Sequence, residues 1–252
     1  MSAAASPDRG APVMRLEGVG KDFGAVTALR ECSLDVHAGE VVAIVGDNGA
    51  GKSTLMKMIA GVHQPSRGQI VLGGEPVRMS DPSVARRHGI EVVYQDLALA
   101  DQQPVYMNMF LGRELTRGPL RRLDRKRMAR ESQALMDELD VRVPSVGANV
   151  RDLSGGQRQG VAIGRAAHWA RLLVLMDEPT AALGVQETAR TEELIMRMRE
   201  RGRGIMIVSH SLDQVFRVSN RICVLRRGEQ IGVLETAQTT GDEIVSMITG
   251  LR

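Results

Sequence analysis

Aromatic residues are scarce in this sequence, and cysteine is almost absent. Only 2% of the 252 residues are Phe, Tyr or Trp, so few rings are available for stacking on the bases of a single-stranded nucleic acid. The two cysteines, Cys32 and Cys223, lie far apart and outside any CxxC pattern. This spacing excludes a cysteine-based metal site and favours a reducing compartment. The core must therefore be built from Val, Ile, Leu, Ala and the 14 methionines.

Long hydrophobic runs are missing as well. A membrane-spanning helix needs about 20 mainly apolar residues. The apolar stretches of this sequence are much shorter, such as RLLVLMD at residues 171–177, so we expect no membrane span. The opening residues 1–13 also contain no apolar run, and we expect them to form a disordered tail rather than a signal peptide.

The charge is nearly balanced over the whole chain but not along it. A formal net charge of +3 does not by itself demand an anionic polymer as a partner. Residues 113–130, however, hold eight basic and two acidic residues, a local net charge of +6. A solvated helix face explains such a run. A surface that meets acidic lipid headgroups or an acidic partner is the alternative, which the sequence leaves open.

Short apolar segments alternate with helical ones, which predicts an α/β fold. Strands are expected within residues 14–45, and buried strands at LLVLMDEP (172–179) and GIMIVSHS (204–211) flank an amphipathic helix at 186–202. Residues 97–150 show a helical period and no strong strand. We therefore expect a mainly parallel sheet with helices on both faces and an inserted helical segment. Shorter elements are predicted as a helix at 52–61, a hairpin through Gly73 and Gly74, a strand at 89–96 and a closing hairpin at 221–234.

A phosphate-binding loop follows one of the buried strands. The stretch GDNGAGKST at residues 46–54 fits G-x-x-x-x-G-K-[ST], with Gly46, Gly51, Lys52 and Ser53 at the defining positions. The glycines let backbone amides wrap the phosphates, the lysine places a charge on them, and the serine hydroxyl reaches Mg²⁺. The alternative is a tight turn between strand and helix. The strand before the loop and the helix after it favour nucleotide binding.

Two adjacent carboxylates end the strand LLVLMDEP. The carboxyl ends of parallel strands form the ligand crevice of an open α/β sheet. Asp177 is therefore expected to hold Mg²⁺, and Glu178 to orient or deprotonate the water that attacks the γ-phosphate. An acidic helix start after the strand is the alternative, which Pro179 supports. Two polar residues have a similar placement: His210 and Gln95 follow other strands, where each is either a phosphate, water or Mg²⁺ contact or a satisfied core polar group.

A second glycine loop, DLSGGQRQG at residues 152–160, completes a series of motifs. GDNGAGKST, YQD, LSGGQRQ, LMDEPT and VSH occur in the order found in ABC-type ATPase domains, and LSGGQ is highly specific to that family. The chain thus resembles this family from Gly46 to His210, with flanking strands that extend the likeness. The resemblance implies a single P-loop domain of ABC type at residues 14–252. It also implies an N-terminal antiparallel β subdomain and a helical subdomain at about 97–165.

The resemblance also implies a composite site for ATP and Mg²⁺. In this family two domains dock head to tail, so that the LSGGQ loop of one serves the nucleotide held by the other. Phe23, upstream of the phosphate loop, would stack on adenine, although a buried core aromatic is the alternative. The implied nucleotide contacts are Phe23, Gly46, Asp47, Asn48, Gly49, Ala50, Gly51, Lys52, Ser53 and Thr54, with Ser154, Gly155, Gly156 and Gln157 from the partner. The implied metal ligands are Ser53, Gln95 and Asp177, and the implied catalytic residues are Lys52, Gln95, Glu178 and His210.

Two longer segments, residues 93–115 and 177–188, resemble the ATPase components of bacterial ribose-, xylose- and fructose-type importers. That likeness implies an ATP-hydrolysing subunit, peripheral on the cytoplasmic face of the inner membrane. It would pair with a second copy of itself and with permease subunits, act indirectly with a periplasmic sugar-binding protein, and bind no nucleic acid. One departure concerns Gly184, which stands where the family usually places an acid. The alternatives are a soluble ABC ATPase acting on ribosomes or nucleic acid, and a P-loop kinase, which would lack LSGGQ. The sequence does not identify the sugar.

Overall fold

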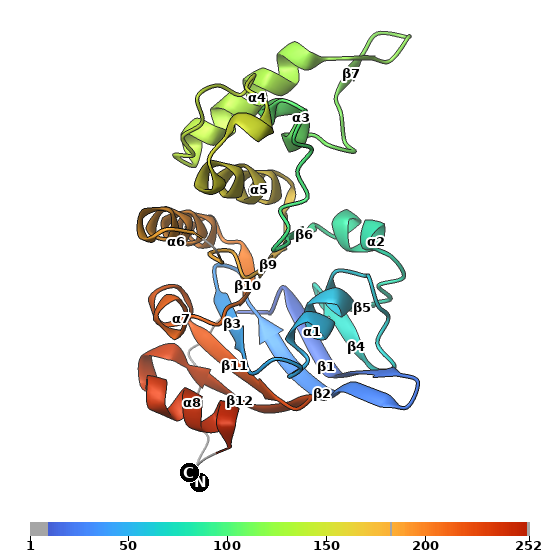
Figure 1. The fold of residues 1–252 in the computed structure, drawn as a ribbon. Helices are drawn as coiled ribbons and strands as arrows, with labels where there is room; N and C mark the ends of the chain where they lie inside the picture. The colour runs from blue at the N-terminus through green and yellow to red at the C-terminus, as the bar shows by residue number, and fades with distance from the viewer. Residues whose placement is uncertain (1–9, 182, 251–252) are drawn as a thin grey trace.

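A computed structural model describes residues 10–181 and 183–250 of the chain (Figure 1). The expected tail falls largely on residues 1–9, which lie outside the described residues. Within the described part, ten strands form one large sheet. Its strands are β1 (Met14–Phe23), β2 (Val26–Val36), β3 (Val41–Val45), β4 (Arg67–Leu72), β5 (Glu75–Val77), β6 (Ile90–Val93), β9 (Leu173–Asp177), β10 (Gly204–Val208), β11 (Arg221–Arg226) and β12 (Glu229–Glu235).

The sheet has a parallel half and an antiparallel half. Its strand order is β5-β4-β1-β2-β12-β11-β3-β10-β9-β6. Strands β11, β3, β10, β9 and β6 pair in parallel, so their carboxyl ends meet at one edge, whereas β12 closes an antiparallel hairpin with β11. On the other side, β2, β1, β4 and β5 pair antiparallel, and one residue pair, Glu31 with Glu229, links β2 to β12. The α/β fold with an N-terminal antiparallel part is confirmed.

Eight α-helices cover the sheet or stand beyond it within the described residues. They are α1 (Lys52–Ile59), α2 (Pro82–Arg87), α3 (Val105–Met109), α4 (Arg125–Glu138), α5 (Gly155–Trp169), α6 (Val185–Glu200), α7 (Leu212–Val218) and α8 (Gly241–Thr249). The sequence analysis predicted α1, α4, α5 and α6 and missed the others. None of the described helices is long and apolar enough to cross a bilayer.

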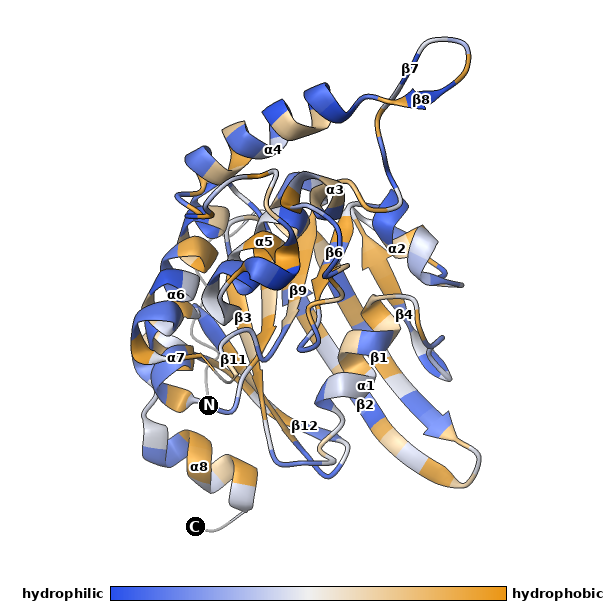
Figure 2. Cartoon of the chain, turned by 45° about the horizontal axis from the view of Figure 1, so that its top comes forward, coloured by the Kyte–Doolittle hydropathy of each residue, from blue (hydrophilic) through white to orange (hydrophobic). Residues whose placement is uncertain are grey.

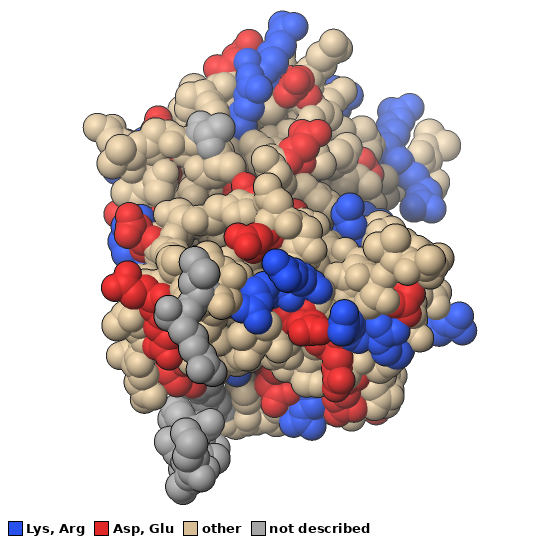
Figure 3. Space-filling model, turned by 60° about the horizontal axis from the view of Figure 1, so that its bottom comes forward, with Lys and Arg blue, Asp and Glu red and all other residues tan. Residues whose placement is uncertain are grey.

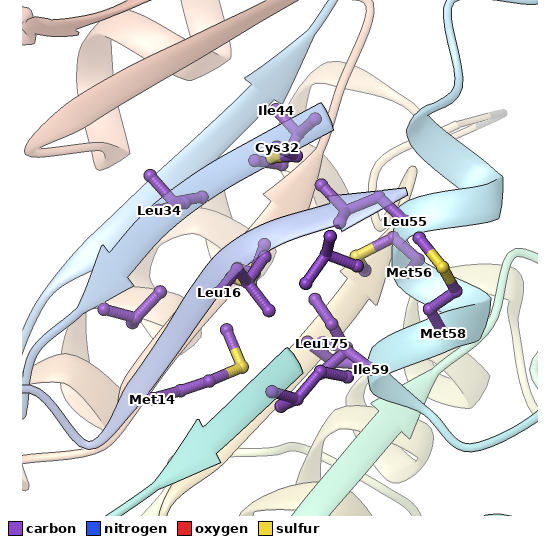
Figure 4. Close-up of a cluster of buried hydrophobic side chains, with 14 of the residues drawn as sticks. Met14, Leu16, Cys32, Leu34, Ile44, Leu55, Met56, Met58, Ile59 and Leu175 are labelled. Atoms are coloured by element: carbon purple, nitrogen blue, oxygen red, sulfur yellow. The ribbon is translucent and has the colours of Figure 1, made fainter. Parts of the chain in front are cut away.

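Two apolar layers hold the parallel half together. On β3, side chains alternate between them: Val42 and Ile44 pack with α1 and the antiparallel strands, while Val41, Ala43 and Val45 pack with α5, α6 and α7. Figure 4 shows the first layer, where methionines and leucines from β1 and α1 meet. Figure 2 shows the same pattern as apolar central strands beneath helices with one polar face. Flexible methionines thus fill the space that aromatic residues fill elsewhere.

The helical subdomain has a core of its own. Helices α3, α4 and α5 pack around a cluster that includes Met109, Phe110, Met128 and Met136, apart from the sheet (Figure 1). Its last helix continues to Trp169, beyond the expected boundary at residue 165. No strong strand was expected in this region, and its described residues hold only two very short ones. A hairpin of two short strands, β7 (Thr116–Arg117) and β8 (Arg122–Leu123), projects from it, closed by a turn that contains Gly118.

Candidate functional site

The phosphate loop lies at the carboxyl edge of the parallel strands, between β3 and α1. Gly46 has a positive φ, and a Cβ there would collide with the carbonyl oxygen of Leu225. Gly51 begins α1 in the left-handed region at φ 101°, which favours glycine. The buried Lys52 Nζ donates hydrogen bonds to the carbonyl oxygens of Gly46 (2.6 Å) and Asp47 (2.9 Å), so the loop curls around its ammonium group.

The rest of the loop is open to a ligand. Burial lowers the pKa of the Lys52 ammonium, while the charges of Glu178, Asp47 and Asp177 act in the opposite direction. The lysine therefore lies within electrostatic reach of Asp177, at the end of β9, and of Glu178, which follows it. Asp47, Asn48, Gly49 and Ser53 are exposed, Thr54 is partly exposed and Ala50 is buried.

The two predicted carboxylates stand at the end of β9, beside β10. Asp177 pairs with Val208 in the sheet, and the backbone N–H of Glu178 donates to the Val208 carbonyl oxygen (2.9 Å). Glu178 adopts φ 49°, a left-handed conformation that is uncommon for a residue with a side chain. Burial raises the pKa of the Asp177 carboxyl, and the neighbouring Glu178 charge raises it further. Such strained or perturbed groups cluster at functional sites.

His210 contacts the second of these carboxylates. Its Nε2 lies 2.8 Å from Oε1 of Glu178. Both residues follow neighbouring parallel strands, β9 and β10, which brings their side chains to the same edge of the sheet. The two catalytic candidates are therefore joined in one pair, and the alternative of a buried core histidine fails because the His210 side chain is 47% exposed.

Gln95 lies at the same edge but makes no contact there. It follows β6, which pairs with β9 in parallel, and its side chain is exposed. Within residues 10–181 and 183–250 no hydrogen bond is formed by its amide group. The residue is thus brought toward Asp177 by the sheet and is free to meet a ligand.

The second glycine loop begins α5, in the helical subdomain, whereas the phosphate loop begins α1 on the sheet (Figure 1). Ser154 caps α5 in a reciprocal box: its Oγ accepts from the Gln157 N–H (3.2 Å), and Gln157 Oε1 accepts from the Ser154 N–H (2.9 Å). A Cβ on Gly155 would meet open space, so this part of the loop faces outward. Its four residues are therefore not brought to the phosphate loop of the same chain.

Glu187, which no motif in the sequence indicates, fills the space beside Gly156 of this loop and beside Gly184. A Cβ on Gly156 would collide with the aliphatic part of the Glu187 side chain. A Cβ on Gly184, at the start of α6, would lie 2.7 Å from Glu187 Oε2. An acid at position 184 would therefore place a second carboxylate beside that of Glu187, whose flexible end would have to move aside. The glycine avoids this like-charge contact.

Phe23 is exposed rather than buried. Its relative accessibility is 44%, so the alternative of a core aromatic is wrong. The ring meets His63 edge to face, with centroids 5.1 Å apart, and the Nζ of Lys21 lies 5.3 Å from its centroid. An exposed ring held by a second ring offers a platform on which a flat ligand can stack. His63 carries no sequence signal of this contact, because it lies on a different segment.

One further contact ties α5 to the segment after Gln95. Arg165 donates to the carbonyl oxygens of Leu97 (3.0 Å) and Ala98 (2.9 Å). Burial lowers the pKa of this guanidinium, and Ala98 has a left-handed φ of 48°. Helix α5, which begins with the second glycine loop, is therefore fastened to the chain that carries Gln95. No motif in the sequence indicates this link.

Comparisons with known proteins agree with the motif order. A family model described as ABC transporter matches residues 29–181. The xylose/arabinose import ATP-binding protein XylG of Sulfolobus acidocaldarius is 45% identical over 94% of both chains. The fructose import ATP-binding protein FrcA of Rhizobium meliloti is 42% identical over 96% of this chain and 95% of that protein. The ribose import ATP-binding protein RbsA of Yersinia pestis is 40% identical over 95% of this chain, which spans 46% of that longer protein.

Solved structures show the same fold. An ATP-binding cassette of an ABC transporter in its ADP conformation superimposes with a TM-score of 0.82 at 24% identity, over 96% of both chains. A nucleotide-free cassette of an ABC transporter gives a TM-score of 0.79 at 24% identity, over 95% of this chain and 96% of the other.

Proposed function

The chain belongs to the ABC transporter family, and from that premise we propose that it binds and hydrolyses ATP to power import of a monosaccharide. Two relatives that match it over nearly their whole length are import ATP-binding proteins for xylose or arabinose and for fructose. The observation that carries the catalytic part is the Glu178–His210 pair, set at the sheet edge where the phosphate loop begins. The proposed unit is one ABC domain at residues 14–252, with its helical subdomain at about 97–165 extended through α5.

The loop between β3 and α1 would hold the phosphates of ATP. The Lys52 ammonium lies inside the curl of this loop, and the left-handed glycines leave room for close approach of a phosphate to the backbone amides. Lys52 is partly neutralised by backbone carbonyls and would exchange these contacts for phosphate oxygens. Phe23 would stack on the adenine at the opposite end of the nucleotide.

The oxygen donors nearby fit Mg²⁺. A hydroxyl, a carboxylate and an amide oxygen are hard ligands, and the burial that raises the Asp177 pKa would be relieved by a cation beside it. Ser53, Asp177 and Gln95 would hold the ion. When bound, Mg²⁺ neutralises charge on the β- and γ-phosphate oxygens.

Glu178 would orient the attacking water and accept its proton. The left-handed backbone turns this side chain away from the line of β9, and His210 fixes one of its oxygens at 2.8 Å. His210 would donate toward the carboxylate or the γ-phosphate, keeping the water in line with the bond that breaks. Phosphoryl transfer depends mainly on such positioning, because the protein forms no covalent bond in the reaction.

The separation of the two glycine loops implies action between two copies. Ser154, Gly155, Gly156 and Gln157 lie at the start of α5 in the helical subdomain, where Ser154 and Gly155 are exposed, whereas the phosphate loop lies on the sheet. A second copy in head-to-tail orientation would bring them to the γ-phosphate. ATP would then join two surfaces that ADP joins poorly, so hydrolysis would reopen the dimer.

A groove near Gln95 offers the permease a place to dock. It encloses about 380 Å³ and lies between α2, β6 and the ends of α3 and α5. Tyr94 and Leu111 are exposed along it, and both are large apolar side chains. Because Tyr94 directly precedes Gln95, a change at the γ-phosphate would be transmitted through Gln95 to a permease helix bound in this groove. The chain would thus be peripheral on the cytoplasmic face of the membrane, with the sugar-binding protein on the other side.

Reconstitution tests this proposal. The chain would be combined in proteoliposomes with the permease and binding protein encoded beside it, and uptake of labelled xylose, ribose and fructose measured with and without ATP. We expect ATP-dependent uptake of one sugar and ATPase stimulation by its binding protein. An ATPase rate that does not change with the permease but rises when ribosomes or DNA are added would favour a soluble ABC ATPase instead.

A further inference from the structure

We propose that the segment 116–126, here called the basic hairpin, is a docking surface for the anionic lipid headgroups of the membrane. The segment comprises β7, β8 and the start of α4, and it projects from the helical subdomain (Figure 1). The inference rests on the proposed role as a peripheral subunit of a membrane transporter, and it assigns part of that attachment to lipid rather than to the permease.

The cations of the basic hairpin form no ion pairs with the part of the chain that the structure describes. The two acids nearby are occupied: Glu114 accepts from the Gly112 N–H (3.0 Å), and Asp124 caps α4 by accepting from the Arg127 N–H (3.1 Å). Arg127 in turn pairs with Glu131. Among the described residues, five exposed cations of the hairpin form no ion pair: Arg117, Arg121, Arg122, Arg125 and Lys126.

Their arrangement does not serve the fold. Arg117 and Arg122 lie directly opposite each other in the β7–β8 ladder, where like charges destabilise a strand pair. Arg125 and Lys126 occupy the first turn of α4, the positive end of the helix dipole, which favours acids. A set of charges that opposes its own local structure, yet stays exposed, is best explained by an external anion.

An apolar tip accompanies the charge. Leu120, at the turn between β7 and β8, is 74% exposed, and Leu123 on β8 is exposed as well. A large apolar side chain between arginines matches the composition of interfacial membrane segments, where leucine enters the acyl boundary and cations meet the headgroups. A surface made only for a protein or for water does not need this exposed leucine.

The position of the basic hairpin favours lipid over the permease. Gly112 and Arg113 line the proposed docking groove, and the chain leads directly from them into β7. The hairpin and α2 lie on the same side of the molecule (Figures 1 and 2), so the hairpin would stand at the rim of the permease. Cytoplasmic loops of membrane proteins carry an excess of Lys and Arg, which would repel it, whereas the cytoplasmic leaflet carries anionic lipid.

The opposite end of the molecule has a different charge pattern. Figure 3 shows basic and acidic side chains lying beside one another on the face turned away from the helical subdomain. On the antiparallel strands β1 and β2, Arg15 pairs with Asp35, and Arg30 pairs with Glu229. Unpartnered positive charge with an exposed leucine therefore distinguishes the basic hairpin from that face, and these paired arginines supply a matched control.

Sedimentation with vesicles tests the inference without the permease. The full chain would be mixed with sucrose-loaded vesicles of phosphatidylcholine alone or with 30% phosphatidylglycerol, a fraction of about a third chosen to resemble an anionic leaflet. Each cation near such a surface raises the partition coefficient about fivefold. Arg117→Glu with Arg122→Glu keeps a like-charge pair in the ladder and should reduce binding by at least about 25-fold.

Control variants separate lipid binding from folding and from ATPase activity. Arg15→Glu with Arg30→Glu carries the same charge change at the other end and should bind anionic vesicles like the wild type. Leu120→Ser should weaken binding several-fold, and all variants should keep the basal ATPase rate, because the hairpin lies far from the phosphate loop. The inference is overturned if the catalytically active wild-type chain does not bind anionic vesicles. It is also overturned if a hairpin variant binds them as strongly as the wild type does. A hairpin variant whose only defect is binding to permease in neutral lipid overturns it as well.

Discussion

At the scale of single residues, the backbone of Glu178 adopts a strained conformation. A side-chain-bearing residue at φ 49° costs about 1–3 kcal/mol relative to a relaxed conformation. The hydrogen bond from its N–H to Val208 and the contact with His210 hold it there. The strain aims the carboxylate at one point beside the phosphate loop. A glutamate at a relaxed strand end would point elsewhere.

Replacing that carboxylate should separate binding from hydrolysis. Glu178→Gln keeps the shape of the side chain but cannot accept a proton, so turnover should fall by roughly 10²–10⁴-fold while ATP still binds. The variant should accumulate as an ATP-bound dimer, which size exclusion with radiolabelled ATP would detect. Glu200→Gln, at the exposed end of α6, is the control and should behave as wild type. Wild-type turnover in Glu178→Gln would remove this residue from the mechanism.

Phe23 should determine affinity for the base but not the rate of chemistry. Stacking is worth about 1–3 kcal/mol per base, so Phe23→Ala should raise the KM for ATP by roughly 5- to 150-fold with kcat largely kept. Because stacking reads the face of a purine, GTP should also be hydrolysed by the wild type and its KM should rise in parallel. Kinetics with both nucleotides would measure this.

The exposure of Phe23 supplies the check on that prediction. A ring that is 44% exposed contributes little to the core, so the melting temperature without nucleotide should stay close to that of the wild type. A large loss of thermal stability with an unchanged KM would mean that the ring supports the fold and does not touch ATP.

At the scale of elements, strong local sequence patterns were sufficient to predict strands and helices. Contacts between residues far apart in sequence could not be predicted from such patterns. Strands β3, β9 and β10 are short apolar runs, and α6 is a long amphipathic helix, so their periodicity predicted them. Two of the helices that were not predicted have a recognisable N-cap residue in the sequence. Ser211 caps α7, and Thr240 caps α8 with Glu243 three residues after it. Helix α2 is one and a half turns long, too short for a periodic pattern to be decisive.

The site shows the same division. The pairing of Glu178 with His210 was predictable, because parallel strands deliver their carboxyl ends to one edge. The Glu187 contact with Gly156 depends on how α6 packs against α5, and the Arg165 contact depends on how a loop passes over a helix. Such contacts join residues far apart in sequence and leave no local pattern. Only the folded chain brings them together.

Loosening the link between α5 and the Gln95 segment should slow hydrolysis. Arg165→Lys keeps a positive charge but loses the fork that reaches two carbonyl oxygens at once, Leu97 and Ala98. We expect the free energy of unfolding to fall by about 1–3 kcal/mol and kcat to fall roughly tenfold, with the KM for ATP nearly unchanged. Denaturant unfolding and steady-state kinetics would measure the two effects.

A conservative change elsewhere serves as the comparison for Arg165. Arg130→Lys lies on the exposed side of α4 and should alter neither quantity. If Arg165→Lys lowers stability while leaving kcat intact, the contact supports packing alone and does not position Gln95.

At the scale of the whole molecule, the two glycine loops lie in different parts of the chain. The phosphate loop belongs to the sheet and the LSGGQ loop to the helical subdomain, and both face outward. Within one chain the phosphate loop and the LSGGQ loop stay apart, because the sheet and the helical subdomain have separate cores. The assembled enzyme is therefore expected to be the dimer.

Mixing two inactive variants should restore activity. Ser154→Arg blocks the LSGGQ loop, and Lys52→Ala disables the phosphate loop, so each chain alone should be nearly inactive. Mixed dimers contain one intact composite site and one doubly altered site, and up to about half of the chains form them if association is random. ATPase assays on mixtures of fixed total concentration would reveal the recovery. Full activity in a Ser154→Arg chain shown to be monomeric would rule out action between copies.

The single tryptophan of the sequence stands where the helical subdomain meets the rest of the chain. Its Nε1 donates to the Met109 carbonyl oxygen (2.9 Å), and the Arg113 guanidinium lies 4.7 Å from its ring. Arg113 also pairs with Glu91 on β6, so the indole stands between α5 and the sheet. The chain consequently carries one indole fluorophore, in addition to its two tyrosines, where the helical subdomain meets the sheet. Stopped-flow emission from the unlabelled chain, excited in the indole band, should report in real time any movement of the helical subdomain that the proposed nucleotide cycle produces.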